Sequence, residues 1–172
     1  MRASAVRICM TTNEPTLFVD TNILIYATRP ASPWHLLARN KLDQAVSNGV
    51  ELVVSPQILR EYLASTTRRT PDGEQTPLSD SLASIAIFRE IFRVLEENNT
   101  VVDMLLAQLQ QIDVSGKKVH DANIVATMRA YGVGRLLTHN TQDFVRYNHL
   151  ITVVPLESPN SPSIASLLDL ES

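Results

Sequence analysis

Short apolar runs alternate along this chain with longer segments of helical periodicity, and this alternation is the strongest constraint on its fold. The apolar runs cover residues 17–19, 50–54, 136–137 and 151–154, and polar residues or proline bound each of them. Continuous apolar runs of this length are typical of strands that are buried on both faces, as in a parallel sheet. Residues 92–95 are a weaker candidate for a fifth strand.

Helical patterns fill the gaps between these runs. A helix is expected to begin near Asn22, and the other predicted helices cover residues 34–46, 58–63, 79–91, 101–109 and 119–131. Strands that alternate with helices predict an α/β fold with a parallel sheet. Right-handed crossovers then place the carboxyl ends of all strands at one edge, where such sheets bind their ligands.

The length and the distribution of polar residues predict one domain with an additional segment at each end. The chain has 172 residues, which is the size of a single domain. We expect this domain to cover residues 15–156, with an N-terminal extension at 1–14 and a Ser- and Pro-containing acidic tail at 157–172. The polar stretch 66–77, which holds two prolines and a glycine, predicts a surface loop.

The charge balance and the single cysteine exclude several classes of protein. The chain has 15 Lys and Arg and 18 Asp and Glu, so it does not bind nucleic acid through bulk positive charge. Three of the acidic residues lie after residue 156, where there is no Lys or Arg, so residues 1–156 are neutral overall. A single cysteine, Cys9, excludes an intramolecular disulfide and a thiolate zinc cluster and favours the cytoplasm. No apolar run is long enough to span a membrane.

Four acidic residues fall where the predicted sheet would gather its functional groups. Asp20 follows the first strand directly, and Asp143 lies just past the strand at 136–137. Glu61 and Asp121 lie on predicted helices beside apolar positions. Each residue also has an ordinary interpretation. Asp20 and Asp143 are good helix caps. Asp121 suits a first helical turn, and Glu61 suits a solvated helix surface.

Four carboxylates at one edge would repel one another unless they bind a cation. Oxygen ligands without cysteine indicate a hard ion, Mg²⁺ or Mn²⁺. The chemistry that needs such an ion is phosphodiester hydrolysis, in which the metal lowers the pKa of the attacking water and stabilises charge on the phosphate. No pair of the four histidines has zinc-ligand spacing, so a histidine metal site is not expected.

Four segments of the sequence, in order, resemble the motifs of the PIN-domain nucleases. They are residues 18–26 (FVDTNILIY), 55–62 (SPQILREY), 119–127 (VHDANIVAT) and 136–144 (LLTHNTQDF). The combination is most similar to the VapC-type toxin ribonucleases of bacterial toxin–antitoxin pairs. The resemblance implies a PIN-like three-layer α/β/α sandwich around a central, mostly parallel sheet of about five strands. It also implies endonucleolytic cleavage of RNA that depends on Mg²⁺ or Mn²⁺.

The resemblance also assigns residues to the site. The catalytic acids would be Asp20, Glu61, Asp121 and Asp143, with Asp20, Asp121 and Asp143 as metal ligands. Asn22, Thr138 and Asn140 would position ligands or the attacking water. Asn140 stands where many relatives carry an acid, so either Asp143 is the fourth acid or the site uses three acids and an amide. Candidates for binding the RNA backbone are Arg60, Arg68, Arg69, Lys117 and Lys118.

The expected partners are RNA, an antitoxin encoded by a neighbouring gene and a second copy of the chain. The apolar helices over 79–109 could supply both protein interfaces. Tyr26 and Trp34 could stack on bases, although core packing is the simpler interpretation. One alternative function is a catalytically silent module that binds RNA or protein. Another is a phosphotransferase with Asp20 as nucleophile, but these enzymes usually carry a second acid where this chain has Asn22.

Overall fold

Five strands form one sheet in the computed structural model, which describes residues 15–69, 75–112 and 114–157. The strands are β1 (Thr16–Val19), β2 (Glu51–Val54), β3 (Arg93–Val94), β4 (Arg135–Thr138) and β5 (Thr152–Pro155). Their order in the sheet is β3-β2-β1-β4-β5, and every pairing is parallel. The strand predictions are confirmed, including the weak one at 92–95, although β3 is only two residues long. Residues 1–14, 70–74 and 158–172, where the extension, part of the loop and nearly all of the tail were expected, lie outside the described residues.

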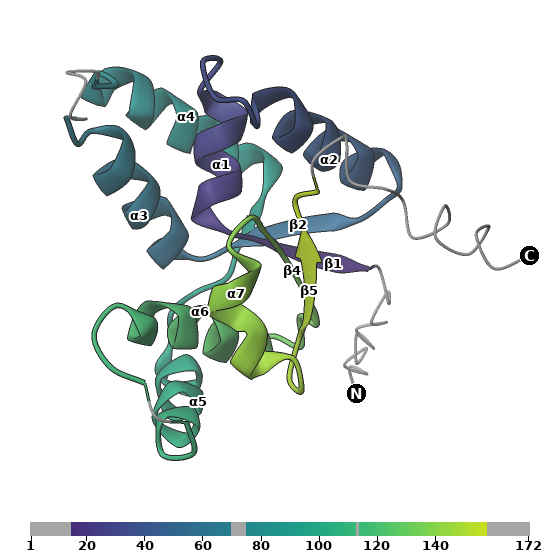
Figure 1. The fold of residues 1–172 in the computed structure, drawn as a ribbon, viewed down its shortest axis with the longest axis vertical. Helices are drawn as coiled ribbons and strands as arrows, with labels where there is room; N and C mark the ends of the chain where they lie inside the picture. The colour runs from purple at the N-terminus through teal and green to yellow at the C-terminus, as the bar shows by residue number, and fades with distance from the viewer. Residues whose placement is uncertain (1–14, 70–74, 113, 158–172) are drawn as a thin grey trace, which may run out of the picture.

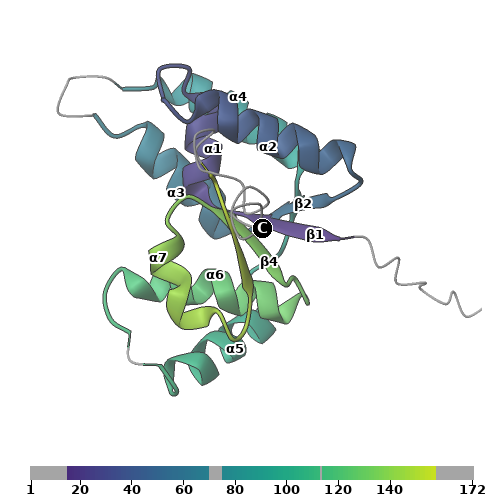
Figure 2. The same ribbon diagram turned by 45° about the vertical axis from the view of Figure 1, so that its right-hand side comes forward.

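Helices cover both faces of this sheet (Figures 1 and 2). One layer contains α1 (Thr21–Thr28), α2 (His35–Ser47), α3 (Pro56–Thr66) and α4 (Leu78–Ile91). The opposite layer contains α5 (Asn99–Leu109) and α6 (Lys118–Ala130), which pack closely against each other. A short helix, α7 (Thr141–Phe144), and a 3₁₀ turn (Val145–Tyr147) connect β4 to β5. The predicted three-layer α/β/α sandwich is confirmed, and the sheet is parallel throughout.

The core lies on both faces of the three central strands. Phe18 and Val19 of β1, Val53 of β2 and Leu136 and Leu137 of β4 are fully buried. Burial on both faces explains why these strands are continuous apolar runs rather than alternating ones. Among the described residues, no helix has the length and apolarity that a membrane span requires.

Local sequence signals fix where the site-bearing helices begin. The Asp20 carboxylate caps α1, since it accepts a hydrogen bond from the Thr21 backbone N–H at 2.6 Å. Ser55 occupies the same position before α3, and Pro56 follows in the first turn, where its missing N–H costs nothing. Both helices therefore begin directly at the carboxyl ends of β1 and β2.

Candidate active site

The topology of the sheet creates one natural position for a site. The chain runs outward from β1 through β2 to β3 and then returns to place β4 on the other side of β1. In open parallel sheets, such a switch point leaves a crevice beyond the carboxyl ends of the two strands. Asp20 directly follows β1, and Thr138 is the last residue of β4. These two residues flank the switch point.

The Asp20 carboxylate is held by three hydrogen bonds at this position. Its Oδ1 accepts from the Thr21 backbone N–H at 2.6 Å. Its Oδ2 accepts from the Thr138 hydroxyl at 2.6 Å and from the Asn22 amide at 2.7 Å. A carboxylate has about four acceptor positions, so these bonds leave about one for a ligand. Asp20 is thus both the cap of α1 and an oriented acid with little freedom to move.

The hydroxyl of Thr138 links β4 to the start of α1. Besides donating to Asp20, its Oγ1 accepts from the Asn22 amide at 3.1 Å and from the Asn140 backbone N–H at 3.0 Å. Asn22 in turn accepts from the His139 backbone N–H at 3.0 Å. A hydroxyl has one donor and two acceptor sites, and all three are used here. Thr138 and Asn22, the residues expected to position ligands, therefore orient Asp20 directly.

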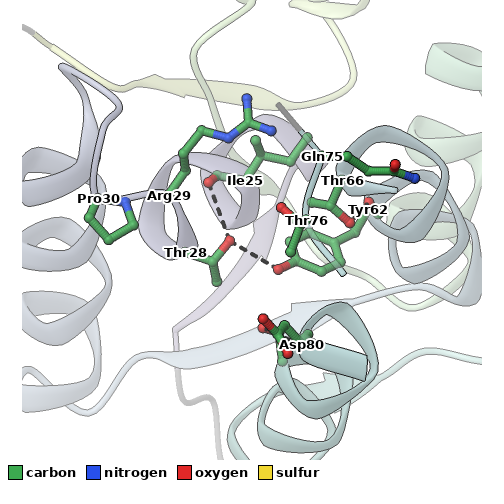
Figure 3. A pocket seen from close by; sticks show the side chains of 10 residues that line it. Ile25, Thr28, Arg29, Pro30, Tyr62, Thr66, Gln75, Thr76 and Asp80 are labelled. Atoms are coloured by element: carbon green, nitrogen blue, oxygen red, sulfur yellow. Dashed lines mark hydrogen bonds between the residues drawn. The ribbon is translucent and has the colours of Figure 1, made fainter. Parts of the chain in front are cut away.

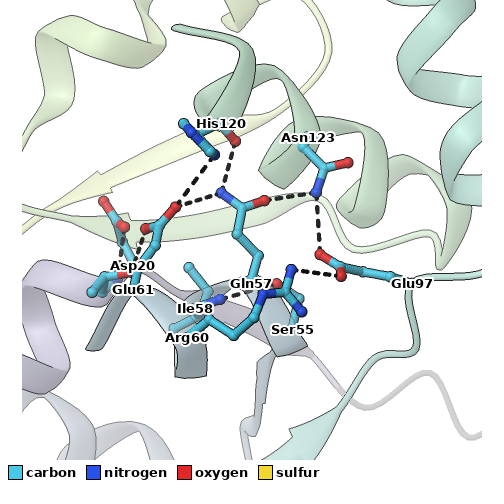
Figure 4. Close-up of polar contacts among 10 residues, drawn as sticks. Asp20, Ser55, Gln57, Ile58, Arg60, Glu61, Glu97, His120 and Asn123 are labelled. Carbon is cyan, nitrogen blue, oxygen red and sulfur yellow. Dashed lines mark hydrogen bonds and ion pairs between the residues drawn. The ribbon is translucent and has the colours of Figure 1, made fainter. Parts of the chain in front are cut away.

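Glu61 approaches Asp20 from α3 and is also held at both oxygens (Figure 4). Its Oε2 accepts from the Thr21 hydroxyl at 2.9 Å, and its Oε1 accepts from the Gln57 amide at 2.7 Å. His120 lies farther away, with its Nδ1 3.9 Å from Oε1. The Glu61 side chain is 34% exposed, so it is neither the freely solvated helix residue of the ordinary interpretation nor fully buried.

Gln57 connects Glu61 to α6, and its role was not predicted from the sequence. Its side chain is only 4% exposed, and its amide also donates to the His120 backbone carbonyl at 3.0 Å. Its carbonyl accepts from the Asn123 amide at 2.6 Å (Figure 4). Asn123 also donates to Glu97, which pairs with Arg60 at 2.8 Å. The only signal in the sequence was the position of Gln57 four residues before Glu61, which places both on one helix face.

Asp121 and Asp143 are the other two acids expected at this edge of the sheet. We refer to Asp20, Glu61, Asp121 and Asp143 as the acidic edge. Asp121 lies in the first turn of α6 and Asp143 in the first turn of α7. Burial raises the pKa of Asp121 from 3.8 to about 6, and the charges of Asp143, Asp20 and Glu61 add to the effect. The charge of the neighbouring His120 acts in the opposite direction and lowers the pKa of Asp121.

Burial also raises the pKa of Asp20 from 3.8 to about 6. Its hydrogen bonds from Thr138, Thr21 and Asn22 act in the opposite direction, and the charge of Glu61 raises the pKa further. Two acids with raised pKa values at one sheet edge are typical of a functional site. Charge repulsion thus links Asp121 to the other three acids that the sequence singled out, although within the described residues no three of these acids surround a common point.

The remaining candidate residues lie at varying distances from these acids. Asn140 is exposed at the start of α7, where its side chain forms no capping bond. Lys117 and Lys118 are exposed at the start of α6, three to four residues before Asp121. Arg60 is half of the ion pair with Glu97. Arg68 and Arg69 follow the far end of α3, away from the carboxylates.

A hollow of about 570 Å³ lies elsewhere, between the ends of α1 and α3 and the start of α4 (Figure 3). Arg29, Gln75 and Asp80 are among the polar residues that line it. The Tyr62 hydroxyl donates to Thr28 across it at 3.0 Å. None of the four site acids lines this hollow, so it is separate from the acidic edge.

Comparison with known proteins identifies the family. A sequence model described as "PIN domain" matches residues 17–150. The chain therefore belongs to the PIN domain family. A search of curated proteins finds no match.

Solved structures with the same fold include several toxin–antitoxin proteins. A chain of DNA-bound VapBC from Salmonella typhimurium has a TM-score of 0.61 and 16% identity, with 83% of this chain and 99% of that chain covered. A chain of promoter-bound VapBC2 from Rickettsia felis has a TM-score of 0.60 and 18% identity, covering 81% and 98%. VapC20 from Mycobacterium tuberculosis, described as a sarcin-ricin loop cleaving toxin, has a TM-score of 0.53 and 20% identity, covering 70% and 86%. At these identities the likeness shows a shared fold.

Proposed function

We propose that this chain is a metal-dependent endoribonuclease and the toxin of a toxin–antitoxin pair. The observation that carries the proposal is Asp20, fixed by three hydrogen bonds at the switch point of the sheet and facing the charges of Glu61 and Asp121. Membership of the PIN domain family and the fold shared with VapC20, which is described as a sarcin-ricin loop cleaving toxin, support it. We place its action in the cytoplasm.

The donor set fits Mg²⁺ or Mn²⁺. Asp20, Asp121 and Asp143 offer only carboxylate oxygens, which hard divalent ions prefer. Within the described residues, no three Asp, Glu, His or Cys side chains already surround a common point. Mg²⁺ does not require such a cage, since it is usually held by one or two carboxylates and several waters. A divalent ion bound here would neutralise repulsion between the acids, lower the pKa of a water molecule and stabilise charge on the phosphate.

The residues of the chain supply orientation and proton transfer. Thr138 and Asn22 keep the Asp20 carboxylate facing the crevice. Glu61 is partly exposed and held by Thr21 and Gln57, so it can accept a hydrogen bond from the attacking water or take up its proton. The exposed Asn140 amide can orient a water or a phosphate oxygen. Lys117 and Lys118 lie beside Asp121 and can attract the RNA backbone.

Cleavage that depends on a divalent ion tests the proposal. We expect purified protein to cut end-labelled single-stranded RNA with Mg²⁺ or Mn²⁺, to stop when EDTA is in excess, and to recover when Mg²⁺ is restored. Gel electrophoresis of the products measures this. Cleavage that EDTA does not affect would indicate a contaminating nuclease, and intact RNA under all metal conditions would support a silent binding module.

The Gln57 network gives a second expected result. In Gln57→Leu, the Glu61 carboxylate and the Asn123 amide lose a partner, so we expect cleavage to fall about 10- to 100-fold. Stability should fall by about 1–3 kcal/mol because polar groups lose partners. RNA cleavage rates and urea unfolding measure the two effects.

Gln108→Leu is the matched control for this variant. Gln108 is also a buried glutamine that donates to a carbonyl of α6, that of Ala122 at 3.1 Å, but it does not contact Glu61. Because the Oε1 of Gln108 is buried without a partner among the described residues, we expect a smaller loss of stability than in Gln57→Leu, with cleavage retained. Equal loss of cleavage in both variants would mean that Gln57 only supports the fold.

The antitoxin partner and the homodimer are also proposals. One structural neighbour is described as a toxin–antitoxin complex, and three others are described as VapBC structures. On this chain, Leu78, Leu82, Ile87 and Ile91 of α4 are about half exposed. Val102 and Leu106 of α5 are exposed to a similar degree. Apolar surface of this kind supports protein contacts at the helices where they were expected.

A further inference from the structure

Three aromatic rings from different segments converge beside the acidic edge. Tyr26 comes from α1, Trp34 directly precedes α2, and His139 directly follows β4. The ring centres of Trp34 and His139 are 4.4 Å apart, those of Tyr26 and His139 are 5.5 Å apart, and those of Tyr26 and Trp34 are 6.4 Å apart. We refer to these three residues as the aromatic cluster.

Hydrogen bonds tie this cluster to the site. His139 follows Thr138 in the chain, and its backbone N–H donates to Asn22 at 3.0 Å. Asn22 contacts Asp20 and lies one helical turn before Tyr26, on the same face of α1. The cluster is therefore a direct neighbour of the residues that orient Asp20.

The cluster is partly open to solvent. All three side chains are half-buried rather than buried. Within the described part of the chain, neither the Tyr26 hydroxyl nor the Trp34 indole N–H forms a hydrogen bond, and neither is among the buried atoms that lack a partner. Both polar atoms therefore reach water. Tyr and Trp that serve only as core normally bury these groups against a partner.

We propose that the aromatic cluster is a stacking site for an unpaired base of RNA, next to the phosphate that is cut. This inference rests on the proposed ribonuclease function and identifies the side chains that would hold a base beside the cut. Every base has a face that can stack on an aromatic ring, whereas bases inside a duplex are covered by their neighbours. The free N–H and O–H groups of Trp34 and Tyr26 can bond to the edge of a stacked base.

Trp34 is the single tryptophan of the chain, so its fluorescence reports on the cluster. The probe is a short single-stranded oligoadenylate in Mg²⁺, read by stopped flow before cleavage advances. An abasic oligomer of the same length is the control for the backbone alone. We expect the oligoadenylate to quench Trp34 and the abasic oligomer to have little effect.

His139→Leu keeps the reporter but removes one stacking ring. We expect it to raise the half-saturating oligoadenylate concentration by roughly 5- to 100-fold. Tyr131→Phe, at the distant end of α6, is the matched control and should behave like the wild type. Circular dichroism establishes that both variants are folded. Equal quenching by the abasic oligomer, or an unchanged half-saturation in His139→Leu, would overturn the proposal.

A cleavage assay separates failure of this proposal from failure of the proposed function. Abasic nucleotides are placed one at a time along an RNA that the protein cuts, and KM is measured for wild type and Trp34→Leu. We expect an abasic nucleotide at one position near the cut to raise the KM of the wild type but not the KM of Trp34→Leu. Cleavage without such a position would contradict the stacking site alone, whereas quenching without cleavage would contradict the nuclease alone.

Discussion

Asp121→Asn is expected to abolish RNA cleavage and, in the metal-free protein, to raise the unfolding temperature. Cleavage should fall by at least about 100- to 1,000-fold, because the ion that would stabilise the transition-state charge loses a ligand. The unfolding temperature should rise by a few degrees because the substitution removes a half-buried charge that Asp143, Asp20 and Glu61 repel. Cleavage rates with Mg²⁺ and thermal unfolding in EDTA measure the two effects.

Burial of Asp121, together with this repulsion and against the opposing charge of His120, gives the metal-free protein a pH dependence. The pKa of Asp121 is about 6 in the folded chain and 3.8 in its ordinary state, so the folded state binds the proton more tightly. The stability from this group is fully present below pH 3.8 and is lost as the pH rises through about 6. We expect wild-type protein in EDTA to unfold at a lower temperature at pH 7.5 than at pH 5. The difference should be smaller in Asp121→Asn.

Asp103→Asn is the control for the loss of one negative charge. Asp103 is exposed on α5, outside the site. We expect it to leave both cleavage and the stability of the metal-free protein near wild-type values. If Asp121→Asn lost stability in EDTA, the acids would not be repelling one another. If it cut RNA normally, Asp121 would not belong to the site.

Thr138→Val is the second substitution with a large expected effect. Valine has the shape of threonine but cannot form hydrogen bonds. Asp20, Asn22 and the Asn140 backbone N–H therefore each lose their bond to the fully buried Thr138 hydroxyl. We expect stability to fall by about 1–3 kcal/mol and cleavage to fall about 10- to 100-fold. Urea unfolding and cleavage rates at saturating Mg²⁺ measure these losses.

Thr138→Ser tests whether the losses in Thr138→Val come from the missing hydroxyl group. Serine keeps all three hydrogen bonds and removes only a methyl group, so we expect most of the cleavage to remain. If Thr138→Ser lost as much cleavage as Thr138→Val, packing at the end of β4 would matter more than the orientation of Asp20.

The strands were predictable from the sequence because three of them are buried on both faces. Phe18, Val53 and Leu137 belong to short apolar runs, too short for a helix, in which Glu51 is the one charged residue. The same reasoning predicted that residues following β1 and β4 would meet, since a parallel sheet has a single carboxyl edge. The sequence signal for β3 was weak because the pattern of a two-residue strand hardly differs from that of a loop.

The sequence offered two interpretations of Asp20, a helix cap and a metal-binding acid, and the contacts of its two carboxylate oxygens show that the first does not exclude the second. One carboxylate oxygen caps α1, while the other receives the Thr138 and Asn22 side chains. A strand that ends where a helix begins needs a cap at the same point where the sheet gathers its functional groups. The two properties therefore coincide at one residue instead of competing.

The contacts of the residues that surround the site acids could not be predicted from the sequence. Gln57 and Asn123 are single polar residues on amphipathic helices, and their contact depends on how α3 and α6 approach each other across the edge of the sheet. The pairing of Arg60 with Glu97 likewise joins residues 37 positions apart. Periodicity places such residues on a helix but does not identify the partner that each one meets.

The hydrogen bond between Asp20 and Thr138 has a consequence for the time at which the site forms during synthesis. It joins residues 118 positions apart, and Asp143 lies farther along the chain still. A ribosome must therefore complete nearly the whole domain before the first acid is oriented and the fourth is present. Nascent and truncated chains that end before β4 contain Asp20 and Glu61 but not the assembled edge. Under the proposed function, the chain cannot cut its own messenger RNA until translation of that message is almost finished.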